Sequence, residues 1–409
     1  MIEPDIRKIL FLSDDFPPDS LGGAGTVAYN LAKAIKELGH DVHVISATQD
    51  KSKEGNCIQN GLKIYKIYSQ YHRRWRAYFS LFNPWTVKKT GKIIDDIKPD
   101  IVYAHNIHHH LSYYCLKIAK LSGASVFLTA HDAMLFNYGK IKVPAQATCE
   151  NYLDYCVPSA WSQIKEFKKR YNPARNIIIR RYIKKYVDKV IAVSDALKTV
   201  LMLNDIINVE VIHNGIDFGA YEVNRAAVSI FKQNNGIENK KIILFGGRIS
   251  EDKGINQVLG SLGLILKEVP DVLLLIAGSA DWGVNEIALP IKFMGWLSQE
   301  DMKIAMTASD LIIFPSICFE TVGLVVLEAM TAGKPVIGTC FGGASEVIID
   351  GETGYIVNPY NVRIMADRAI DLLKNTEKSL EFGQKGYERA KNIFGLKRQA
   401  QKYLDLYKS

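Results

Sequence analysis

The sequence contains no apolar run long enough to cross a lipid bilayer. A membrane-spanning helix needs about 18 or more consecutive apolar residues, whereas runs such as Ile9–Ser13 and Asp271–Gly278 have the length of buried strands. Glu3, Asp5, Arg7 and Lys8 stand before the first apolar run, so acidic residues are present where a secretory signal peptide has a positively charged segment. We therefore expect no membrane span, no cleaved leader and a cytoplasmic location.

Cysteine is also scarce. The chain has six cysteines in 409 residues, mostly in segments that we predict as strands or helices. In a chain of this length, that usage favours reduced thiols in a cytoplasm over a disulfide framework. Cys149 and Cys156 lie in a loop-like stretch, and their spacing matches no zinc knuckle. We interpret both as free thiols or local packing residues and assign them no role.

The bulk composition is that of a globular protein. Hydrophobic residues make up 48% of the chain and charged residues 23%, and the length suggests two domains or three. The net charge of +8 fits an anionic partner such as nucleotide phosphates or an acidic membrane face. No nucleic-acid recognition module is visible, so we expect no nucleic-acid partner.

The first half alternates strands and helices. Apolar segments at Lys8–Ser13, Asp41–Ala47, Ile101–His105 and Val126–Ala130 predict strands, and Thr26–Leu38 has helical periodicity. A strand, a loop, a helix and a second strand in this order begin a doubly wound α/β domain.

One glycine pattern in this half is misleading. Gly23, Gly25 and Ala28 fit the dinucleotide-binding G-x-G-x-x-A fingerprint. That fingerprint needs a tight turn directly after the strand, and here a long loop with two prolines intervenes. We therefore discount dinucleotide binding and keep only the expectation that a glycine loop at a helix N-terminus can hold an anion.

Histidines follow two of the predicted strands. His131 lies at the C-terminal end of Val126–Ala130, where it either faces the ligand crevice of the sheet or packs locally. The run His108–His110 could suggest a metal, but ligating histidines usually come from several elements. We expect no metal site.

Two stretches combine basic and aromatic residues, at Tyr71–Trp85 and Lys165–Lys189. Amphipathic segments of this kind can lie on an anionic bilayer. The alternative is an ordinary solvated helix face with an aromatic stripe toward the core.

The second half holds its most informative residues after a predicted buried strand, Leu311–Ser316. Glu320 follows in a loop, Gly323 lies near the start of a helix expected from about Val322, and Glu328 lies further into that helix. The free N–H groups of the helix start suit an anion, and the Glu328 carboxylate could bind a vicinal diol such as ribose. The alternative is a pair of solvated glutamates beside a core helix.

Two cations follow another predicted strand, Lys241–Gly247. The Arg248 guanidinium could bind a phosphate with two parallel N–H groups, and the Lys253 ammonium could bind it as a single compact charge. Both would be well placed for a diphosphate. Strands at Asp271–Gly278 and Ile291–Trp296 continue a second α/β domain. An amphipathic tail, Leu396–Tyr407, is expected to pack back across the first domain.

In order and spacing, these residues resemble the E-x7-E signature of retaining nucleotide-sugar glycosyltransferases of the group-1 type, glycosyltransferase family 4. The residues that carry the resemblance are Gly22-Gly23, Gly39-His40, His131-Asp132, Asn214–Asp217, Gly247-Arg248, Lys253-Gly254, Glu320, Gly323–Val325, Glu328–Met330, Gly333, Pro335-Val336, Gly342-Gly343 and Glu346. In that family an aromatic residue often precedes the signature glycine. Val322 takes that place here, which leaves the shape of the sugar pocket open.

The resemblance implies an α/β GT-B fold, with two Rossmann-like doubly wound domains facing across a cleft and a C-terminal helix crossing back to the first. It implies an acceptor-side domain at residues 1–217, a donor domain at 218–393 and a returning helix at 394–409. By the same resemblance, His131 and Glu320 are the catalytic or sugar-positioning residues. The implied donor-binding residues are Gly22, Gly23, Arg248, Lys253, Gly323, Leu324, Val325 and Glu328.

The implied activity is transfer of a hexose-type sugar from a UDP- or GDP-linked donor to a lipid-linked or saccharide acceptor, in cell-surface polysaccharide or lipopolysaccharide synthesis. The sequence has no D-x-D motif, so cations and a helix dipole would replace a metal at the leaving diphosphate, and we expect no cofactor. A nucleotide-sugar epimerase, a soluble disaccharide-forming synthase and a non-catalytic nucleotide-sugar-binding module remain alternatives.

Overall fold

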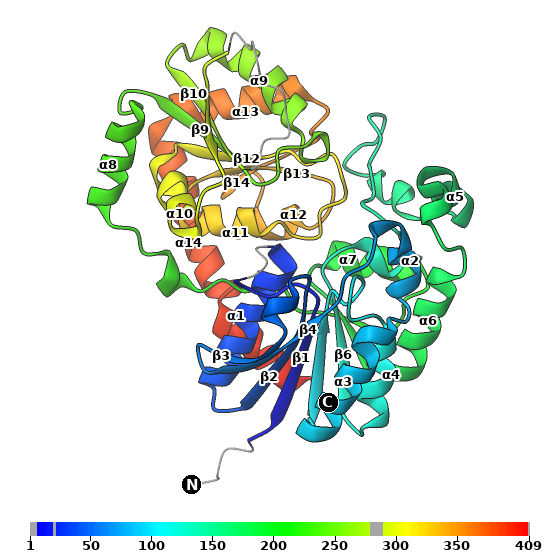
Figure 1. Ribbon diagram of the computed structural model, residues 1–409. Helices are drawn as coiled ribbons and strands as arrows, with labels where there is room; N and C mark the ends of the chain where they lie inside the picture. Colours follow the sequence, from blue (N-terminus) through cyan, green and yellow to red (C-terminus); the bar gives the residue numbers. More distant parts are fainter. Residues whose placement is uncertain (1–5, 19–21, 279–288, 408–409) are drawn as a thin grey trace. The chain divides into compact units, whose positions relative to one another are not determined.

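The computed structural model describes residues 6–18, 22–278 and 289–407 and contains two compact units (Figure 1). Unit 1 comprises the chain up to Lys140, Val157–Gly215 and the segment from Leu396 onward, and unit 2 comprises Ile141–Cys156 and Ile216–Gly395. Part of the charged N-terminal segment and part of the loop expected before the first helix lie outside the described residues.

Unit 1 is built on one sheet with the strand order β3-β4-β2-β1-β5-β6-β7-β8. Its strands are β1 (Lys8–Ser13), β2 (Asp41–Thr48), β3 (Gly55–Gln59), β4 (Leu62–Tyr68), β5 (Ile101–His105), β6 (Ser125–Ala130), β7 (Lys189–Ala192) and β8 (Val209–Val211). All neighbours pair in parallel except β3 and β4, which form an antiparallel hairpin at one edge. The inner strands β1 and β5 are almost entirely buried, as expected for parallel strands covered on both faces.

Helices cover both faces of this sheet (Figure 1). The helices of unit 1 are α1 (Gly23–Glu37), α2 (Arg76–Phe79), α3 (Pro84–Ile97), α4 (Tyr114–Leu121), α5 (Ala160–Phe167), α6 (Arg175–Tyr186), α7 (Asp195–Leu203) and α15 (Leu396–Asp405), with 3-10 turns η1 (Lys51–Lys53), η2 (Arg73–Trp75), η3 (Ala133–Leu135) and η5 (Lys168–Arg170). The tail helix α15 packs against α1. Its Tyr403 is fully buried, and the Tyr403 carbonyl accepts a hydrogen bond from the Tyr103 hydroxyl at 2.5 Å.

Unit 2 is built on a second sheet with the order β11-β10-β9-β12-β13-β14, and all its pairs are parallel. Its strands are β9 (Lys241–Gly246), β10 (Val272–Ala277), β11 (Ile291–Gly295), β12 (Leu311–Phe314), β13 (Val336–Thr339) and β14 (Gly354–Val357). Continuous apolar runs such as LIIF in β12 form these strands because both faces of the sheet are covered.

The helices of unit 2 are α8 (Arg225–Asn235), α9 (Ile255–Glu268), α10 (Gln299–Ala308), α11 (Leu324–Thr331), α12 (Ala344–Val347), α13 (Val362–Lys374) and α14 (Thr376–Ile393), with 3-10 turns η4 (Tyr152–Cys156), η6 (Phe218–Tyr221) and η7 (Glu251–Lys253). Helices α9 and α13 pack together, and α11 packs against α14 (Figure 1). Ser298 caps α10, since its hydroxyl oxygen accepts the Asp301 N–H at 3.1 Å.

The expected architecture of two Rossmann-like units with a returning C-terminal helix is confirmed. The structure also differs from the sequence-based picture in places. Residues Ile141–Cys156 pack in unit 2, although the chain enters and leaves that segment from unit 1. The hairpin of β3 and β4 was not predicted, and the helix expected from about Val322 begins at Leu324.

The prediction of free thiols is wrong for one cysteine of the pair that the sequence singled out. Cys149 forms a disulfide with Cys340, which lies 191 residues further along the chain. Cys156 is buried and is not in a disulfide. Spacing along the sequence carried no signal for this pairing, because the fold brings the two residues together.

Among the described residues, no helix is both long and apolar enough to cross a membrane.

Candidate functional site

Each sheet has a point at which its strand order reverses. In unit 2 the chain runs outward from β9 through β10 to β11, and then outward on the other side from β12 through β13 to β14. The reversal lies between β9 and β12, which are neighbours in the sheet. Open α/β sheets bind ligands outside the carboxyl ends of the strands at such a point.

The predicted residues Lys253 and Glu320 meet at this reversal. The turn η7, which ends at Lys253, follows β9, and Glu320 lies in the loop after β12. The Lys253 ammonium donates to Oε1 of Glu320 at 2.5 Å, and the Ser316 hydroxyl donates to the same oxygen at 2.8 Å. The side chains of Lys253 and Glu320 are only 24% and 14% exposed. Both groups are therefore held in fixed positions by charge-assisted hydrogen bonds.

The loop after β13 fixes the backbone of Glu320. The Glu320 N–H donates to the carbonyl of Phe341 at 2.9 Å, and the Glu320 carbonyl accepts the Gly343 N–H at 2.9 Å. Glu320 and Gly342 form a parallel β-bridge. The predicted Gly342-Gly343 pair thus supports Glu320 from the neighbouring strand end.

Gly323 sets the start of α11. It adopts a φ of +73°, and a Cβ at this position would lie 2.7 Å from Cε1 of Phe314. No side chain caps α11, whose first residues are the half-buried Leu324 and Val325. The uncapped N–H groups and the positive end of the helix dipole suit an anion. The Lys253 ammonium lies 5.1 Å above the same Phe314 ring, which places it near this helix start.

Arg248 follows β9 at the same edge of the sheet. It comes directly after Gly247, which adopts a φ of +119°, and its side chain is exposed. No hydrogen bond or ion pair involves its guanidinium among the residues that the structure describes. Arg248 is therefore available to a diphosphate, whereas Lys253 is already shared with Glu320.

Glu328 has a partner that the sequence did not suggest. Its Oε1 accepts a hydrogen bond from the Tyr221 hydroxyl at 2.9 Å. Lys303 lies 5.1 Å from the Tyr221 ring. Burial raises the pKa of the Glu328 carboxyl, while the Tyr221 hydrogen bond and the Lys303 charge lower it. Glu328 is thus held beside Tyr221 and Lys303. Its burial disfavours the ionised form of the carboxyl group.

Val322 does not line an open pocket. Its side chain is 1% exposed, so it belongs to the core of unit 2. The sequence left open how Val322, in the place of an aromatic residue, shapes the sugar pocket. Because the valine side chain is buried, it acts through packing in the core and not through direct exposure to solvent.

Unit 1 has its own reversal, between β1 and β5. Asp14 follows β1 and is buried, and its carboxylate accepts the backbone N–H groups of His109, His110 and Leu111 at 2.6, 2.8 and 2.7 Å. Burial raises the pKa of Asp14 to about 7, although these hydrogen bonds oppose the rise. Asp14 thus fixes the loop after β5, and the sequence reading had not singled it out.

His131 lies at the end of β6, as predicted. Its Nε2 lies 2.9 Å from Nδ1 of the buried His105, so one ring donates a hydrogen bond to the other. Burial lowers the pKa of His131 to about 4. His131 is therefore a neutral imidazole at pH 7 and can serve as a hydrogen-bonding group, not as a cation.

The neighbouring histidines have separate partners. Nε2 of His108 lies 3.6 Å from Oδ2 of Asp132, and Nδ1 of His110 lies 3.1 Å from the Ser69 hydroxyl. The backbone N–H of His109 is bound by Asp14. These contacts show that the run His108–His110 fixes the loop after β5.

Gly22 and Gly23 lie at the N-terminus of α1. Gly22 is the N-cap residue, and no side chain caps the helix. A Cβ on Gly25 would lie 2.7 Å from the carbonyl oxygen of Asp15, so the first turn passes close to the loop after β1. The helix start keeps N–H groups that could hold an anion, and the roles of Gly22 and Gly23 stay predictions.

The structure narrows the two basic-aromatic stretches to one surface of unit 1. The turns η2 and η5, from the two stretches, lie against each other. The exposed basic and aromatic side chains that they and the adjoining helices α2 and α5 present are Arg73, Arg74, Trp75, Tyr78, Trp161, Lys165, Lys168, Lys169 and Arg170; we call this set the basic-aromatic surface. The acidic Glu166 of α5 is exposed beside them. Trp75 is 46% exposed and Trp161 70%.

Two arginines of these stretches do not belong to that surface, contrary to the sequence-based expectation. Arg175 is fully buried and donates to the carbonyl of Met134 at 2.6 Å. Arg76 is half-buried and donates to the carbonyl of Tyr138 at 2.9 Å. Both guanidiniums support the loop that follows His131 from inside unit 1.

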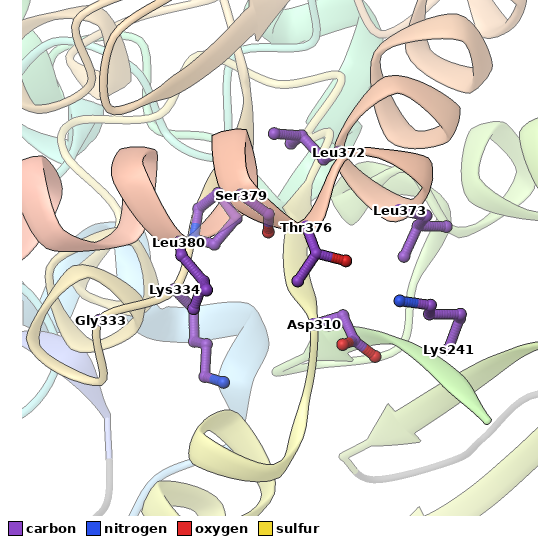
Figure 2. Close-up of a pocket in the computed structure, with 10 residues that line it drawn as sticks. Lys241, Asp310, Gly333, Lys334, Leu372, Leu373, Thr376, Ser379 and Leu380 are labelled. Carbon is purple, nitrogen blue, oxygen red and sulfur yellow. The ribbon is translucent and has the colours of Figure 1, made fainter. Parts of the chain in front are cut away.

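A cavity of about 70 Å³ lies at the opposite edge of the unit 2 sheet (Figure 2). Lys241 begins β9, Asp310 precedes β12 and Lys334 precedes β13, so these residues mark the amino ends of the strands. Thr376 and Leu380 of α14 line the other side. This cavity does not include the carboxyl-edge residues Lys253 and Glu320 and is a separate feature of the unit.

The geometry thus brings together Lys253, Glu320 and the start of α11 within unit 2. Sequence reasoning missed Ser316, Phe314 and Tyr221. Ser316 closes a predicted strand, so its position could have signalled a ligand-edge residue. Tyr221 lies in a short turn outside any recognised pattern, and nothing in its neighbourhood pointed to Glu328.

Comparison with known proteins gives the same picture. The family model described as glycosyl transferases group 1 matches residues 228–389, and the model of glycosyltransferase family 4 matches residues 21–219. The chain is 25% identical to N-acetyl-alpha-D-glucosaminyl L-malate synthase of Bacillus anthracis over 405 residues, which cover 95% of this chain and 94% of that protein.

Two further similarities extend the comparison. Over 217 residues the chain is 32% identical to spore coat protein SA of Bacillus subtilis; these residues cover 48% of this chain and 57% of that relative, little more than half its length. The structure of Anabaena HepE in complex with UDP and glucose superposes with a TM-score of 0.70 at 20% identity, covering 98% of this chain and 99% of that one.

The fold likeness to Anabaena HepE identifies the two Rossmann-like units as a GT-B fold. One family model matches most of the chain that precedes residue 220, and the other matches most of the second half. Together they include all the predicted donor-binding residues. The chain belongs to the group-1 glycosyltransferases, enzymes that use nucleotide sugars.

Proposed function

We propose that the protein is a metal-independent, retaining hexosyltransferase. It moves a hexose-type sugar from a UDP- or GDP-linked donor to a lipid-linked or saccharide acceptor in cell-surface polysaccharide or lipopolysaccharide synthesis. The observation that carries this proposal is the contact of Lys253, Glu320 and Ser316 at the strand-order reversal of unit 2. The UDP and glucose bound by the similar fold of Anabaena HepE support a uridine diphosphate donor.

The cations are arranged for a leaving diphosphate. The exposed Arg248 guanidinium binds one phosphate as a fork, and the Lys253 ammonium, which has three N–H donors, binds phosphate while it holds Glu320. The uncapped start of α11 adds backbone N–H groups at the same edge. These groups take the place that a metal ion has in transferases with a D-x-D motif, because all stabilise negative charge on the β-phosphate.

The reaction follows from this arrangement. The bond between the sugar C1 and the phosphate oxygen breaks, and the nucleoside diphosphate leaves with the electron pair. The acceptor hydroxyl attacks C1 of the oxocarbenium-like sugar on the same face and gives its proton to the departing phosphate. Glu320 positions the sugar hydroxyls, Glu328 binds the ribose diol, and neutral His131 donates or accepts a hydrogen bond near the reacting carbon.

The basic-aromatic surface supports a lipid-linked acceptor. Its lysines and arginines attract anionic lipid headgroups, and its exposed tryptophans suit the interface between headgroups and acyl chains. We propose that this surface of unit 1 lies on the inner face of the plasma membrane, with the enzyme otherwise in the cytoplasm.

Sedimentation with vesicles tests the membrane contact. We expect binding to phosphatidylglycerol vesicles and not to phosphatidylcholine vesicles, and we expect the Trp75→Ala, Trp161→Ala double variant to lose most of it. Trp296→Ala in unit 2, at a site that is 59% exposed, is the matched control and should bind normally. Equal binding to both kinds of vesicle would refute the electrostatic part of the proposal.

A donor panel tests the transfer itself. The nucleotide that raises the melting temperature most identifies the donor base, and release of free nucleoside diphosphate should then require added acceptor. An epimerase would convert the donor sugar without releasing the nucleotide. A non-catalytic module would bind the donor and leave it intact with every acceptor, and a soluble synthase would use a free sugar as well as a lipid-linked one.

A further inference from the structure

The segment Ile141–Cys156, which we call the strap, is bound to the loops that carry Glu320. The Phe319 N–H donates to the carbonyl of Ile141 at 2.9 Å, and the Val143 N–H donates to the carbonyl of Ile317 at 3.1 Å. The strap therefore adds a short antiparallel pairing to the loop immediately before Glu320.

The second half of the strap reaches the other supporting loop. The Tyr152 ring lies 6.4 Å from Phe319 and 5.9 Å from Phe341, between centroids. Phe341 follows Cys340 and supplies the carbonyl that accepts the Glu320 N–H. The disulfide between Cys149 and Cys340 joins the strap covalently to this loop.

The two halves of the strap are held differently. Polar contacts hold the first half, since the Tyr360 hydroxyl donates to the carbonyl of Val143 at 2.6 Å and the Asn358 amide to that of Ala147 at 2.9 Å. In residues 148–156, the disulfide and the Tyr152 and Tyr155 rings join the strap to the rest of unit 2, and the Tyr152 hydroxyl also contacts the Gly342 backbone. Opening the disulfide removes the covalent link of the second half and should loosen it, while the first half stays in place.

The two sulfurs also differ in access. Cys149 is exposed, whereas Cys340 is 5% exposed and packs with Val143, Ala147 and Phe341. A thiol in solution can therefore reach the Cys149 sulfur, with Cys340 as the leaving group. Cys340 would lie in an apolar cluster after the bond opens, beside the loop that supports Glu320.

We propose that Cys149 and Cys340 form a thiol–disulfide exchange site through which a dithiol reductant controls donor binding. One thiolate of the reductant attacks the Cys149 sulfur and releases the Cys340 thiolate, which takes up a proton. The second thiol of the reductant then displaces Cys149, so the protein gains two electrons and two protons and the reductant becomes a disulfide. The loosened half of the strap then braces the Phe341 loop less firmly, so Glu320 is held less firmly from that side.

This inference rests on the proposed donor site for its effect on activity, so the experiment also includes readouts that do not need turnover. The full chain is compared after treatment with dithiothreitol or oxidised glutathione. Alkylation and mass analysis should find Cys149 and Cys340 blocked in the oxidised protein and both labelled after reduction. Hydrogen exchange at residues 148–156 should then accelerate by about tenfold or more, as in a local opening, while the Val143 amide keeps its protection.

The kinetic readout is the donor KM. We expect reduction to raise it by about fivefold, the factor that the loss of one net hydrogen bond gives. Cys149→Ser should show the raised value under both conditions, and Cys57→Ser, at an exposed free thiol of unit 1, should respond as the native protein does. If Cys149→Ser does not fold, the reduced native protein supplies the same comparison.

Two results would overturn the proposal: unchanged exchange at residues 148–156 after reduction, or equal donor KM in both redox states. Loss of all turnover with every donor would instead count against the proposed function, because exchange and alkylation would still report on the strap.

Discussion

Variants of Lys253 and Glu320 can distinguish the contribution of their ion pair to stability from the contribution of the Lys253 ammonium to turnover. The Glu320 side chain is 14% exposed in the native protein, and replacing Lys253 by Met removes the ammonium while the Ser316 hydroxyl still donates to the carboxylate. Breaking a buried ion pair from one side costs about 3–5 kcal/mol. Because the Lys253 side chain is 24% exposed, solvent screening reduces this cost, and we expect about 2 kcal/mol.

That loss should lower the melting temperature by about 4–8 °C for a cooperative unit of this size. The double variant Lys253→Met, Glu320→Gln removes both charges and leaves a neutral amide beside Ser316. It should therefore recover most of the lost stability, since no unpaired carboxylate remains. Thermal unfolding of the native protein, the two single variants and the double variant gives the coupling between the two side chains.

Turnover should not recover with stability. Both variants that lack the Lys253 ammonium should lose about 100-fold or more in kcat, as when a preorganised group for a developing negative charge is removed. Lys241→Met is the matched control, because Lys241 lies at the amino edge of the same sheet, beside the cavity of Figure 2, and should leave kcat unchanged. A double variant with normal turnover would refute the assignment of Lys253 to the diphosphate.

Further predictions concern Glu328 and Gly323 of unit 2 and His131 of unit 1. Glu328→Gln should raise donor KM by about tenfold, as for a lost charged hydrogen bond. Because burial raises the folded-state pKa of Glu328, its contribution to stability is present at low pH and is lost as the pH rises through that pKa, so the Gln variant should gain in melting temperature over the native protein at pH 8 and not at pH 4. Gly323→Ala should destabilise by about 2–4 kcal/mol in urea unfolding, from the positive φ and the overlap with Phe314, whereas Gly333→Ala, at a φ of +66° with open space around it, should cost only about 1 kcal/mol. Because the pKa of His131 is about 4, the profile of kcat against pH should show no step from this residue between pH 5.5 and 8, and a step there that disappears in His131→Gln would contradict its neutral state.

The sequence located the edge of the sheet but not the contacts made there. Continuous apolar runs predicted β9 and β12, and the carboxyl ends of parallel strands must lie along one edge. Lys253 and Glu320 could thus be assigned to the same region. Their ion pair could not, because Lys253 and Glu320 are 67 residues apart in the chain and meet only because β9 and β12 are neighbours in the sheet.

Other features escaped sequence reasoning for different physical reasons. The turn Asn60-Gly61 between β3 and β4 has positive φ at both residues, a recognisable hairpin signal that was not used. The pairing of Cys149 with Cys340 left no local trace, since neither spacing nor composition distinguishes a cysteine that meets a partner through the fold. The burial of Arg175 was likewise invisible, because a charged residue in a basic helix is normally solvated.

The strap has a consequence for the construction of hybrid enzymes. Neither unit is a continuous piece of chain, since unit 2 takes Ile141–Cys156 from within the sequence of unit 1 and unit 1 takes its last helix from beyond unit 2. A hybrid cut once near Gly215 would join a foreign strap to the native donor unit, and Cys340 would keep its disulfide only if that strap also carried a cysteine in place of Cys149. Exchange of donor preference between relatives therefore requires three segments to be moved or kept together: the strap, Ile216–Gly395 and the junction to α15.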